Sequence, residues 1–474
     1  MSKPKLNLGV AKMYFKLRMP GTASRLCEAI TLETINRVVP QVSIEAAIQE
    51  AGVAEQRVRK MTATFSIWVL IGMSLYSQLS IGAVIQKLAK GGRLLWGDGH
   101  EKVATASAFS QRRYQIGARV MRLLFEQVCQ PLATDHTRGA FLFGFRLMAM
   151  DGTQEDVPDT PDNVAVFGRH RGPKGDSGYP KAQTVLLSEC GTHAVVAAEF
   201  GPCAASEHTL ALRLVRALVA GMLLMVDRGF YGFDLIQGVL QRKAQILGRL
   251  AAHVKPTLIQ QLADGSALAY IYPSDYRRRK RGERLPIRVI TYTFTDPQRP
   301  GYQQTHRLFT TLLDPQAYPA LELVCAYHER WEIELVIDEL QVHQRLVNHP
   351  LRSLKPRGII QELYSLLIAH YIVRAMMHEA ALQADLDPDR LSFVGAVRIL
   401  QDALIEFQLA DPSCHSILWT RLFKDIAQQR LPERRNRINP RVVKRTVIRF
   451  PLKRPEHYRA PQPSQQFREA VALI

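Results

Sequence analysis

Apolar residues recur at helical spacing through the first third of the chain. The most apolar stretch, residues 65–85, has the length of a membrane span, but polar residues such as Ser66 and Gln78 interrupt it. We therefore expect a pair of buried helices there. The pattern predicts an all-α domain over residues 1–137. A helix-turn-helix would offer residues 111–114 to DNA, although a solvated helix face explains the same polar run.

From about residue 138 the pattern changes to apolar runs of strand length, namely FRLMAMD, KAQTVLLSE, THAVVAAEF and, after a helical stretch, MLLMVD. Because the last run is apolar on both faces, we expect a mixed sheet covered by helices. Residues 138–244 would form the first part of this α/β core. The runs SALAYIYP, LPIRVITYTFTD and HRLFTTLLD are separated by turn residues, so they predict a β-rich insertion over residues 245–322.

The sequence YHERWEIELVIDELQVHQ, residues 327–344, predicts a single amphipathic helix. At about 100° per residue, one stripe beside its apolar face is polar. That stripe contains Tyr327, Arg330, Glu334 and Gln341. A long helix after Pro356 is predicted to complete the core over residues 323–400. Residues 401–474 predict helices and then a strongly basic tail, which offers contacts to DNA or to a second protomer.

The charge balance of the chain is strongly positive, with 62 Lys and Arg residues against 43 Asp and Glu residues and a formal net charge of +19. An excess of this size favours a polyanionic partner such as nucleic acid. Six cysteines lie scattered without C-x-x-C spacing, which argues against zinc ribbons and disulfide scaffolds. The N-terminal residues hold no long apolar run before a cleavage site, so we expect a cytoplasmic protein without a membrane partner.

Two of the predicted strands end in the same way, with an Asp followed closely by a Gly, at Asp151 and at Asp227. In open α/β sheets, functional groups collect at the carboxyl ends of the strands. A third carboxylate on the polar helical stripe would complete a set that can hold two Mg²⁺ ions beside a phosphodiester, with Mn²⁺ as a substitute. Spacing alone leaves Glu334 and Asp338 open for this third position, because they lie one turn apart.

Together these motifs resemble the signature of the insertion sequence four family of DDE transposases. The residues that carry the resemblance are DGT at Asp151, DRGF at Asp227 and the spaced set Tyr327, Arg330 and Glu334. The resemblance implies a ribonuclease H-like core interrupted by a β-rich insertion, in which Asp151, Asp227 and Glu334 form the metal-binding catalytic triad. It also implies that Tyr327 and Arg330 contact DNA phosphates, and that a homodimer pairs two DNA ends.

The chain departs from the family pattern at Gln341, where a Lys is usual. An amide still donates a hydrogen bond to phosphate, but it lacks the charge and part of the salt-dependent attraction. Arg345, one turn later, is a candidate replacement. Arg169 and Lys174, in the loop between the first two core strands, are further candidates to follow the DNA backbone, with a solvated loop as the alternative.

We therefore expect a Mg²⁺-dependent transposase that binds the terminal inverted repeats of its own element, cleaves at their ends and joins the 3′-hydroxyls to target DNA. The resemblance supplies end recognition and joining, whereas the residues alone support metal-dependent phosphodiester chemistry on nucleic acid. A nuclease with the same core but no joining activity is the first alternative. A transposase-derived regulator that only binds DNA is the second, and Gln341 keeps it open.

Overall fold

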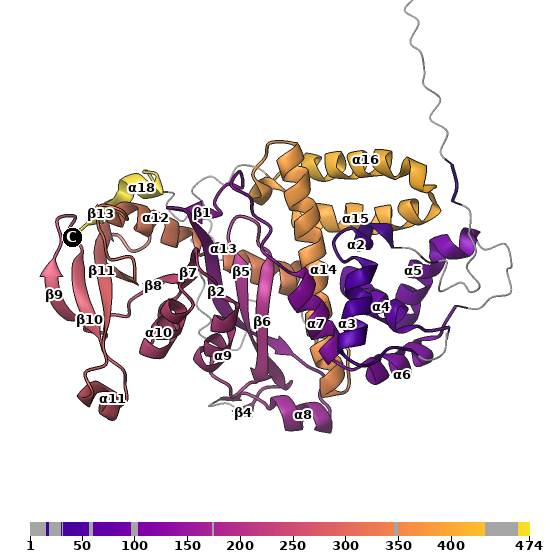
Figure 1. Cartoon of the computed structure of the whole chain (residues 1–474), viewed down its shortest axis with the longest axis horizontal. Helices are drawn as coiled ribbons and strands as arrows, with labels where there is room; N and C mark the ends of the chain where they lie inside the picture. The colour runs from indigo at the N-terminus through magenta and orange to yellow at the C-terminus, as the bar shows by residue number, and fades with distance from the viewer. Residues whose placement is uncertain are drawn as a thin grey trace, which may run out of the picture.

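The computed structural model describes residues 16–18, 30, 32–55, 60–95, 103–172, 175–345, 349–431 and 463–474. Figure 1 shows a large mixed sheet with the N-terminal helices packed to one side of it. A long helix, α14 (Pro356–Gln383), stands between those helices and the sheet. The expected α/β class with a helical N-terminal region is confirmed.

The N-terminal region is built from short helices: α2 (Glu33–Asn36), α3 (Gln41–Glu50), α4 (Ala63–Leu75), α5 (Ile81–Leu95), α6 (Ala106–Ile116) and α7 (Arg119–Val128). Helix α4 is buried along nearly its whole length because α3, α5 and α14 pack around it. The side chain of Thr62 caps it by accepting a hydrogen bond from the backbone N–H of Phe65. The predicted buried helix pair is confirmed. Among the described residues, no helix combines the length and the apolar character that crossing a membrane requires.

The polar run at the end of α6 is not the DNA-facing surface that one interpretation predicted. Arg113 is 3% exposed and donates hydrogen bonds of 3.0 Å to the side-chain oxygen of Gln361 and to the carbonyl of Gly358. Arg112 forms an ion pair with Glu55. The helix-turn-helix interpretation is therefore wrong for Arg113, because its charge is committed to the contact with α14.

The centre of the sheet combines antiparallel and parallel pairs. Strand β6 (Val195–Pro202) pairs antiparallel with β5 (Lys181–Glu189), and β5 pairs antiparallel with β2 (Phe145–Asp156). Strand β2 then pairs in parallel with β7 (Met222–Val226), and β7 with β8 (Gln245–Arg249). Every residue of β7 is buried, which explains its continuous apolar sequence.

Alternate residues of β2 point to opposite faces of the sheet. Met150 packs with apolar residues of α9 (Glu207–Leu214) and α10 (Phe233–Gln241) on one face. Ala149 belongs to the apolar cluster of α12 (Ala320–Glu329) on the other face. The sheet is thus covered on both sides, and side chains near the end of β2 can be reached from either layer.

The strands within the predicted insertion do not form a sheet of their own. Strand β12 (His306–Thr310) pairs with β8 and continues the same sheet through β11 (Leu285–Phe294), β10 (Ala267–Ile271) and β9 (Thr257–Gln261). The last strand, β13 (Val471–Leu473), pairs with β11, so residues from the end of the chain complete this part of the sheet.

The single helix predicted over residues 327–344 is wrong, because the structure divides this segment. Helix α12 ends at Glu329, α13 (Glu332–Asp338) begins two residues after Arg330, and the π-helix η3 (Glu339–His343) follows directly. Arg330 and Trp331, between α12 and α13, keep right-handed helical dihedral angles, and Arg330 still pairs with Glu334 one turn later.

Helix α14 begins at Pro356, as predicted, and is buried along most of its length. It packs against α4, α7 and β6 and against two C-terminal helices, α15 (Phe393–Leu409) and α16 (His415–Gln428). The remaining elements are short: β1 (Phe141–Leu142), α8 (Pro161–Phe167), β3 (Arg171–Gly172), β4 (Gly175–Asp176), η1 (Val215–Ala217), η2 (Arg228–Phe230), α11 (Tyr276–Lys280), η4 (Pro388–Arg390), η5 (Pro412–Cys414) and α18 (Phe467–Ala470).

Candidate active site

Asp151 and Asp227 are neighbours where the parallel pairing of β2 and β7 ends. The register of the two strands sets Met150 opposite Val226, and each acid is the next residue of the chain; β7 ends there, whereas β2 continues to Asp156. The carboxylate of Asp227 accepts a hydrogen bond of 2.7 Å from the backbone N–H of Gly229, which fixes it where the chain leaves the sheet. The sequence predicted this pair because both acids follow buried strands.

Glu334 is connected to Asp151 through Arg330. Nη1 of Arg330 lies 3.4 Å from Oδ2 of Asp151, and Nη2 lies 3.5 Å from Oε1 of Glu334. The Arg330 side chain is only 11% exposed, and Arg330 is the C-cap residue of α12. Its guanidinium therefore lies between two carboxylates in a largely buried position. Asp338, the other acid that spacing left open, pairs with His343 instead.

The charges at this site favour a cation. Burial raises the pKa of Asp151 above its usual range, and the negative charges of Asp227 and Glu334 add to this, while the Gly152 N–H and Arg330 oppose it. Three carboxylates face one guanidinium, so negative charge is in excess. Their oxygens are the hard ligands that Mg²⁺ and Mn²⁺ prefer.

The oxygens of the three acids do not form a compact ligand set in this structure. Among the described residues, the group whose ligand atoms all lie within 4.8 Å of one another is a different one, which contains His193, Glu332 and Asp389. The physical reason lies in Arg330, whose guanidinium occupies the space between Asp151 and Glu334. The residue types fit a divalent cation, and Arg330 acts as their counter-charge in its place.

Tyr327 holds the end of α12 against the end of β7. Its hydroxyl donates a hydrogen bond of 3.1 Å to the carbonyl of Val226, the residue before Asp227. Burial raises the pKa of Tyr327 to about 12, so its hydroxyl keeps its proton at neutral pH. The Arg330 guanidinium lies 5.9 Å from the centre of the Tyr327 ring. Tyr327 thus links α12, which ends just before Arg330, to β7, which ends just before Asp227.

Gln341 docks on the far part of β2. Its side-chain nitrogen donates to the hydroxyl of Thr153 at 2.7 Å and to a carboxylate oxygen of Glu155 at 2.9 Å. Arg345 forms an ion pair with the same Glu155, which is 5% exposed, and donates to the carbonyl of His349 at 2.9 Å. The amide and the guanidinium therefore both bind this strand, two and four residues beyond Asp151.

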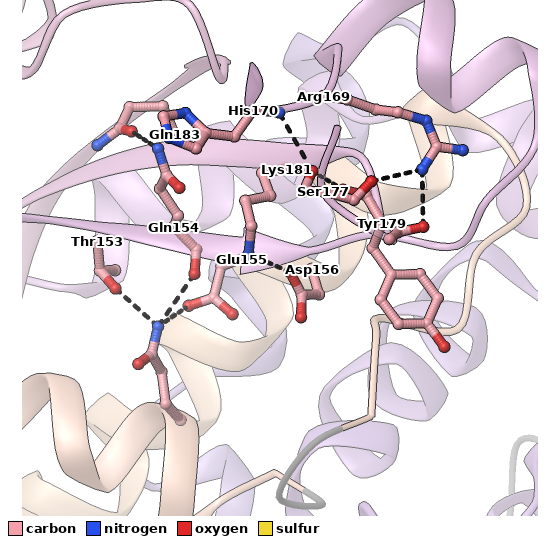
Figure 2. A network of polar contacts seen from close by, with 12 residues as sticks. Thr153, Gln154, Glu155, Asp156, Arg169, His170, Ser177, Tyr179, Lys181 and Gln183 are labelled. Carbon is pink, nitrogen blue, oxygen red and sulfur yellow. Dashed lines mark hydrogen bonds and ion pairs between the residues drawn. The ribbon is translucent and has the colours of Figure 1, made fainter. Parts of the chain in front are cut away.

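Arg169 is tied into its own loop. Its guanidinium donates to the carbonyls of Ser177 and Gly178 at 2.9 and 2.7 Å and forms an ion pair with Asp159. Figure 2 shows Arg169, Ser177 and Tyr179 gathered beside the end of β2 that carries Glu155 and Asp156. The loop lies beside this end of the strand, while Lys174 lies outside the described residues.

One carboxylate near the two Asp residues escaped the sequence analysis. Glu207 is the first residue of α9, directly after the N-cap Ser206, where an acid is ordinary because it complements the helix dipole. A Cβ at Gly152 would lie 2.4 Å from Oε1 of Glu207, so the carboxylate rests directly on the residue after Asp151. Only the folding of α9 onto the sheet reveals this contact, since nothing in the spacing of SEHTL indicates it.

A second ionic cluster lies behind α13 and is buried. His193, in the turn between β5 and β6, lies 3.1 Å from Asp389 and 3.9 Å from Glu332. Burial alone would raise the pKa of Glu339, but Arg374 and two histidines bring it well below its usual range. These contacts join residues 327–344 to α14 and to the turn after β5, and we assign them a role in packing.

Comparisons with known proteins agree on the class of the chain. The family described as "Insertion element 4 transposase N-terminal" matches residues 29–126, and "Transposase DDE domain" matches residues 143–372. The chain is 28% identical over 458 residues to transposase InsG for insertion sequence element IS4 of Escherichia coli (strain K12), covering 94% of this chain and 96% of that protein.

A structural likeness extends to the piggyBac transposase, solved as a synaptic complex with hairpin DNA. It covers 83% of this chain and 85% of that chain, with a TM-score of 0.42 and 12% sequence identity. A likeness this low carries no argument of its own.

Proposed function

Since the chain belongs to the insertion sequence four family of DDE transposases, we propose that it binds the terminal inverted repeats of its own element, cleaves at their ends and joins the freed 3′-hydroxyls to target DNA. Its sheet is the ribonuclease H-like fold of that class. The observation that best supports the proposal is the strand register that makes Asp151 and Asp227 neighbours.

In this proposal Asp151, Asp227 and Glu334 are the catalytic carboxylates and hold two Mg²⁺ ions, which Mn²⁺ can replace. Divalent ions held by such a set activate the attacking oxygen and stabilise the leaving oxygen of a phosphodiester. The protein contributes position. Asp151 is fixed by its strand, Asp227 by its bond to the Gly229 N–H, and Glu334 by the helix that begins after Arg330.

In this proposal Arg330 pairs first with two carboxylates and later with a DNA phosphate. In the structure it balances the charge of Asp151 and Glu334. A guanidinium also binds phosphate oxygens through two parallel N–H groups, and it does so best where water is excluded. Once other positive charge neutralises the acids, Arg330 can turn to a DNA phosphate without leaving a carboxylate unpaired.

The other proposed DNA contacts are Tyr327, Gln341, Arg345, Arg169 and Lys174. Support differs among them. The Gln341 amide binds Thr153, which lies on the same strand as Asp151, so a phosphate near the acids is within reach of this side chain. Arg345 and Arg169 are paired with Glu155 and Asp159, so binding DNA would require them to share or exchange these partners.

The proposal extends to the arrangement of the molecule. We propose that residues 1–137 bind DNA ends, that 138–244 and 323–400 form the catalytic core around the insertion 245–322, and that 401–474 contact DNA or a second protomer. Two protomers would pair two DNA ends in a synaptic complex. The free thiols of the described cysteines fit a cytoplasmic location, where DNA is the partner.

A joining assay tests the proposal directly. Purified protein, Mg²⁺, a labelled inverted-repeat end and a supercoiled target plasmid should yield cut ends and labelled plasmid. Asp151→Asn, Asp227→Asn and Glu334→Gln should each lower cleavage at least about a thousandfold, in the range of losing an essential electrostatic group, while specific end binding persists. Full cleavage in any of the three would remove that residue from the site.

The same assay separates the alternatives. Cleavage without labelled plasmid would identify a nuclease that lacks joining activity. Specific end binding with no cleavage in Mg²⁺ or Mn²⁺ would identify a DNA-binding regulator, in which Gln341 marks the loss of activity. Binding to inverted repeats should weaken as salt rises, because phosphate contacts release counterions.

A further inference from the structure

Glu207 approaches the proposed catalytic acids from the face of the sheet opposite to Glu334. Helix α9 packs on β5 and β6 and against η2, the turn that Asp227 caps. Glu334 comes from the layer of α12 and α13, which packs on the other face. The end of the parallel strand pair β2 and β7 is therefore flanked by one Glu from each helical layer.

The contact between Glu207 and β2 is close and depends on a glycine. A Cβ at Gly152 would meet Oε1, Cδ and Cγ of Glu207 at 2.4, 2.5 and 2.8 Å. Any side chain at residue 152 would therefore displace the carboxylate. Gln183 of β5 donates a hydrogen bond of 3.2 Å to Oε1 and orients it. The glycine of the DGT motif thus makes room for Glu207 beside Asp151.

The Glu207 carboxylate lies near two other carboxylates, and their mutual repulsion is unfavourable unless a positive charge is also present. Partial burial raises the pKa of Glu207, and the negative charges of Asp151 and Asp227 raise it further, opposed by the bond from Gln183. None of these groups is a cation. Glu207 is nevertheless an exposed residue that could turn to solvent, away from two like charges.

We propose that Glu207 is a fourth carboxylate of the catalytic centre and helps Asp151 and Asp227 to hold a divalent cation. This inference rests on the proposed function. Asp151 and Asp227 lie side by side, and one Glu approaches them from each helical layer. Together these residues supply oxygen ligands from both faces of the sheet, and two divalent cations held close together need several such ligands. Helix α9 would then position a ligand as well as cover the sheet.

The test compares Mn²⁺ binding and cleavage in wild type, Glu207→Gln and Asp275→Asn, a control at an exposed Asp of the insertion. Bound Mn²⁺ is measured by electron paramagnetic resonance on the full chain, and folding by thermal melting in chelator. Glu207→Gln should bind Mn²⁺ about tenfold more weakly and need about tenfold more Mg²⁺ for half-maximal cleavage. Glu207→Asp should recover part of both, because it keeps the charge.

Gly152→Ala provides an independent variant, since it displaces the Glu207 carboxylate without removing any charge. It should weaken Mn²⁺ binding, and the double variant with Glu207→Gln should be no weaker than the weaker single variant. A purely structural Glu207 would lower the melting temperature in chelator and leave Mn²⁺ affinity unchanged, which would overturn the inference.

The outcomes also separate this inference from the proposed function. If wild type binds Mn²⁺ and cleaves DNA, but Glu207→Gln equals Asp275→Asn in both measurements, the inference alone is wrong. If wild type neither binds Mn²⁺ nor cleaves, the proposed function fails and the inference fails with it.

Discussion

At the scale of single residues, Arg330 is the side chain on which the electrostatics of the site depend. Its guanidinium lies 3.4 Å from Asp151 and 3.5 Å from Glu334, and it is largely buried. Removing it would leave partly buried carboxylates facing one another, which is costlier than losing an exposed ion pair. Its substitution should therefore affect the fold before DNA is added.

We predict that Arg330→Ala lowers the melting temperature in chelator and enlarges the stabilisation that Mn²⁺ produces, because the cation then supplies the missing positive charge. The affinity for DNA ends should also depend less steeply on salt concentration, by about the amount that one phosphate contact contributes. Thermal melting with and without Mn²⁺ and a salt titration of end binding measure these effects. Arg398→Ala, at an exposed position of α15, is the matched control. Equal Mn²⁺ stabilisation of both variants would contradict the counter-charge role.

The raised pKa of Asp151 makes a second prediction, concerning pH. A carboxyl whose pKa is raised by folding adds stability below its unfolded value, near 3.8, and this stability is lost as pH rises through the folded pKa. In chelator, the free energy of unfolding of wild type minus that of Asp151→Asn should therefore fall from about pH 4 upward and then level off. Urea unfolding at several pH values measures it. A difference that rises with pH would contradict the assignment.

At the scale of elements, the apolar runs before the two Asp residues were predictable, while the end of β2 and the helix geometry were not. Asp151 and Asp227 follow apolar runs whose burial the sequence displays, but β2 continues past Asp151 to Asp156 as a strand paired with β5. The division of residues 327–344 into α12, α13 and η3 has no Pro or Gly to announce it. Glu207 likewise escaped notice, since its approach to Gly152 depends on how α9 packs.

The link from Tyr327 to Val226 gives a prediction about element docking. Tyr327→Phe removes one hydrogen bond between α12 and the end of β7, and leaves a carbonyl without that donor. It should lower the free energy of unfolding by about 1 kcal/mol and reduce cleavage more than end binding. Urea unfolding and the cleavage assay measure both. Tyr272→Phe, at a 40% exposed residue, should be nearly neutral, and an equal loss in the two variants would contradict the link.

Arg345 lies two residues after η3 and forms part of the contact with β2, whatever its role with DNA. Its partner Glu155 is buried, so Arg345→Met should lower the free energy of unfolding by about 3 kcal/mol. Adding Glu155→Gln removes the unpaired charge and should restore part of that loss. Denaturant unfolding of the two single variants and the double variant measures the coupling. Additive losses would show that the pair does not stabilise the fold.

At the scale of the whole molecule, α14 joins the helical N-terminal region to the sheet. It packs on α4 and α7 on one side and on β6 on the other, as Figure 1 shows. The predicted domain boundary at residue 137 came from a change of periodicity, which reports local structure only. The contacts of α14 with the N-terminal helices join residues more than 200 positions apart in sequence, which no local pattern reveals.

The strongest of these contacts is reciprocal. Arg113 donates to the side chain of Gln361, whose nitrogen donates back to the carbonyls of Arg113 and Gly117 at 2.7 and 2.8 Å. Gln361 is fully buried, so these bonds have no water to replace them. These reciprocal bonds, which we call the Arg113–Gln361 clamp, should couple the unfolding of the N-terminal helices to that of the sheet.

We therefore predict that wild type unfolds in one calorimetric transition, whereas Gln361→Leu removes one partner of the Arg113 guanidinium and the amide donor to two carbonyls, and splits the transition. The N-terminal helices should then melt first and lose end binding at a lower temperature than the sheet unfolds. Scanning calorimetry and end binding across temperature measure this. Gln401→Leu, which removes a bond between α15 and the Leu75 carbonyl instead, compares a different contact of the same region. If Gln361→Leu retains a single transition, packing of α4 on α14 must couple the two parts without the clamp.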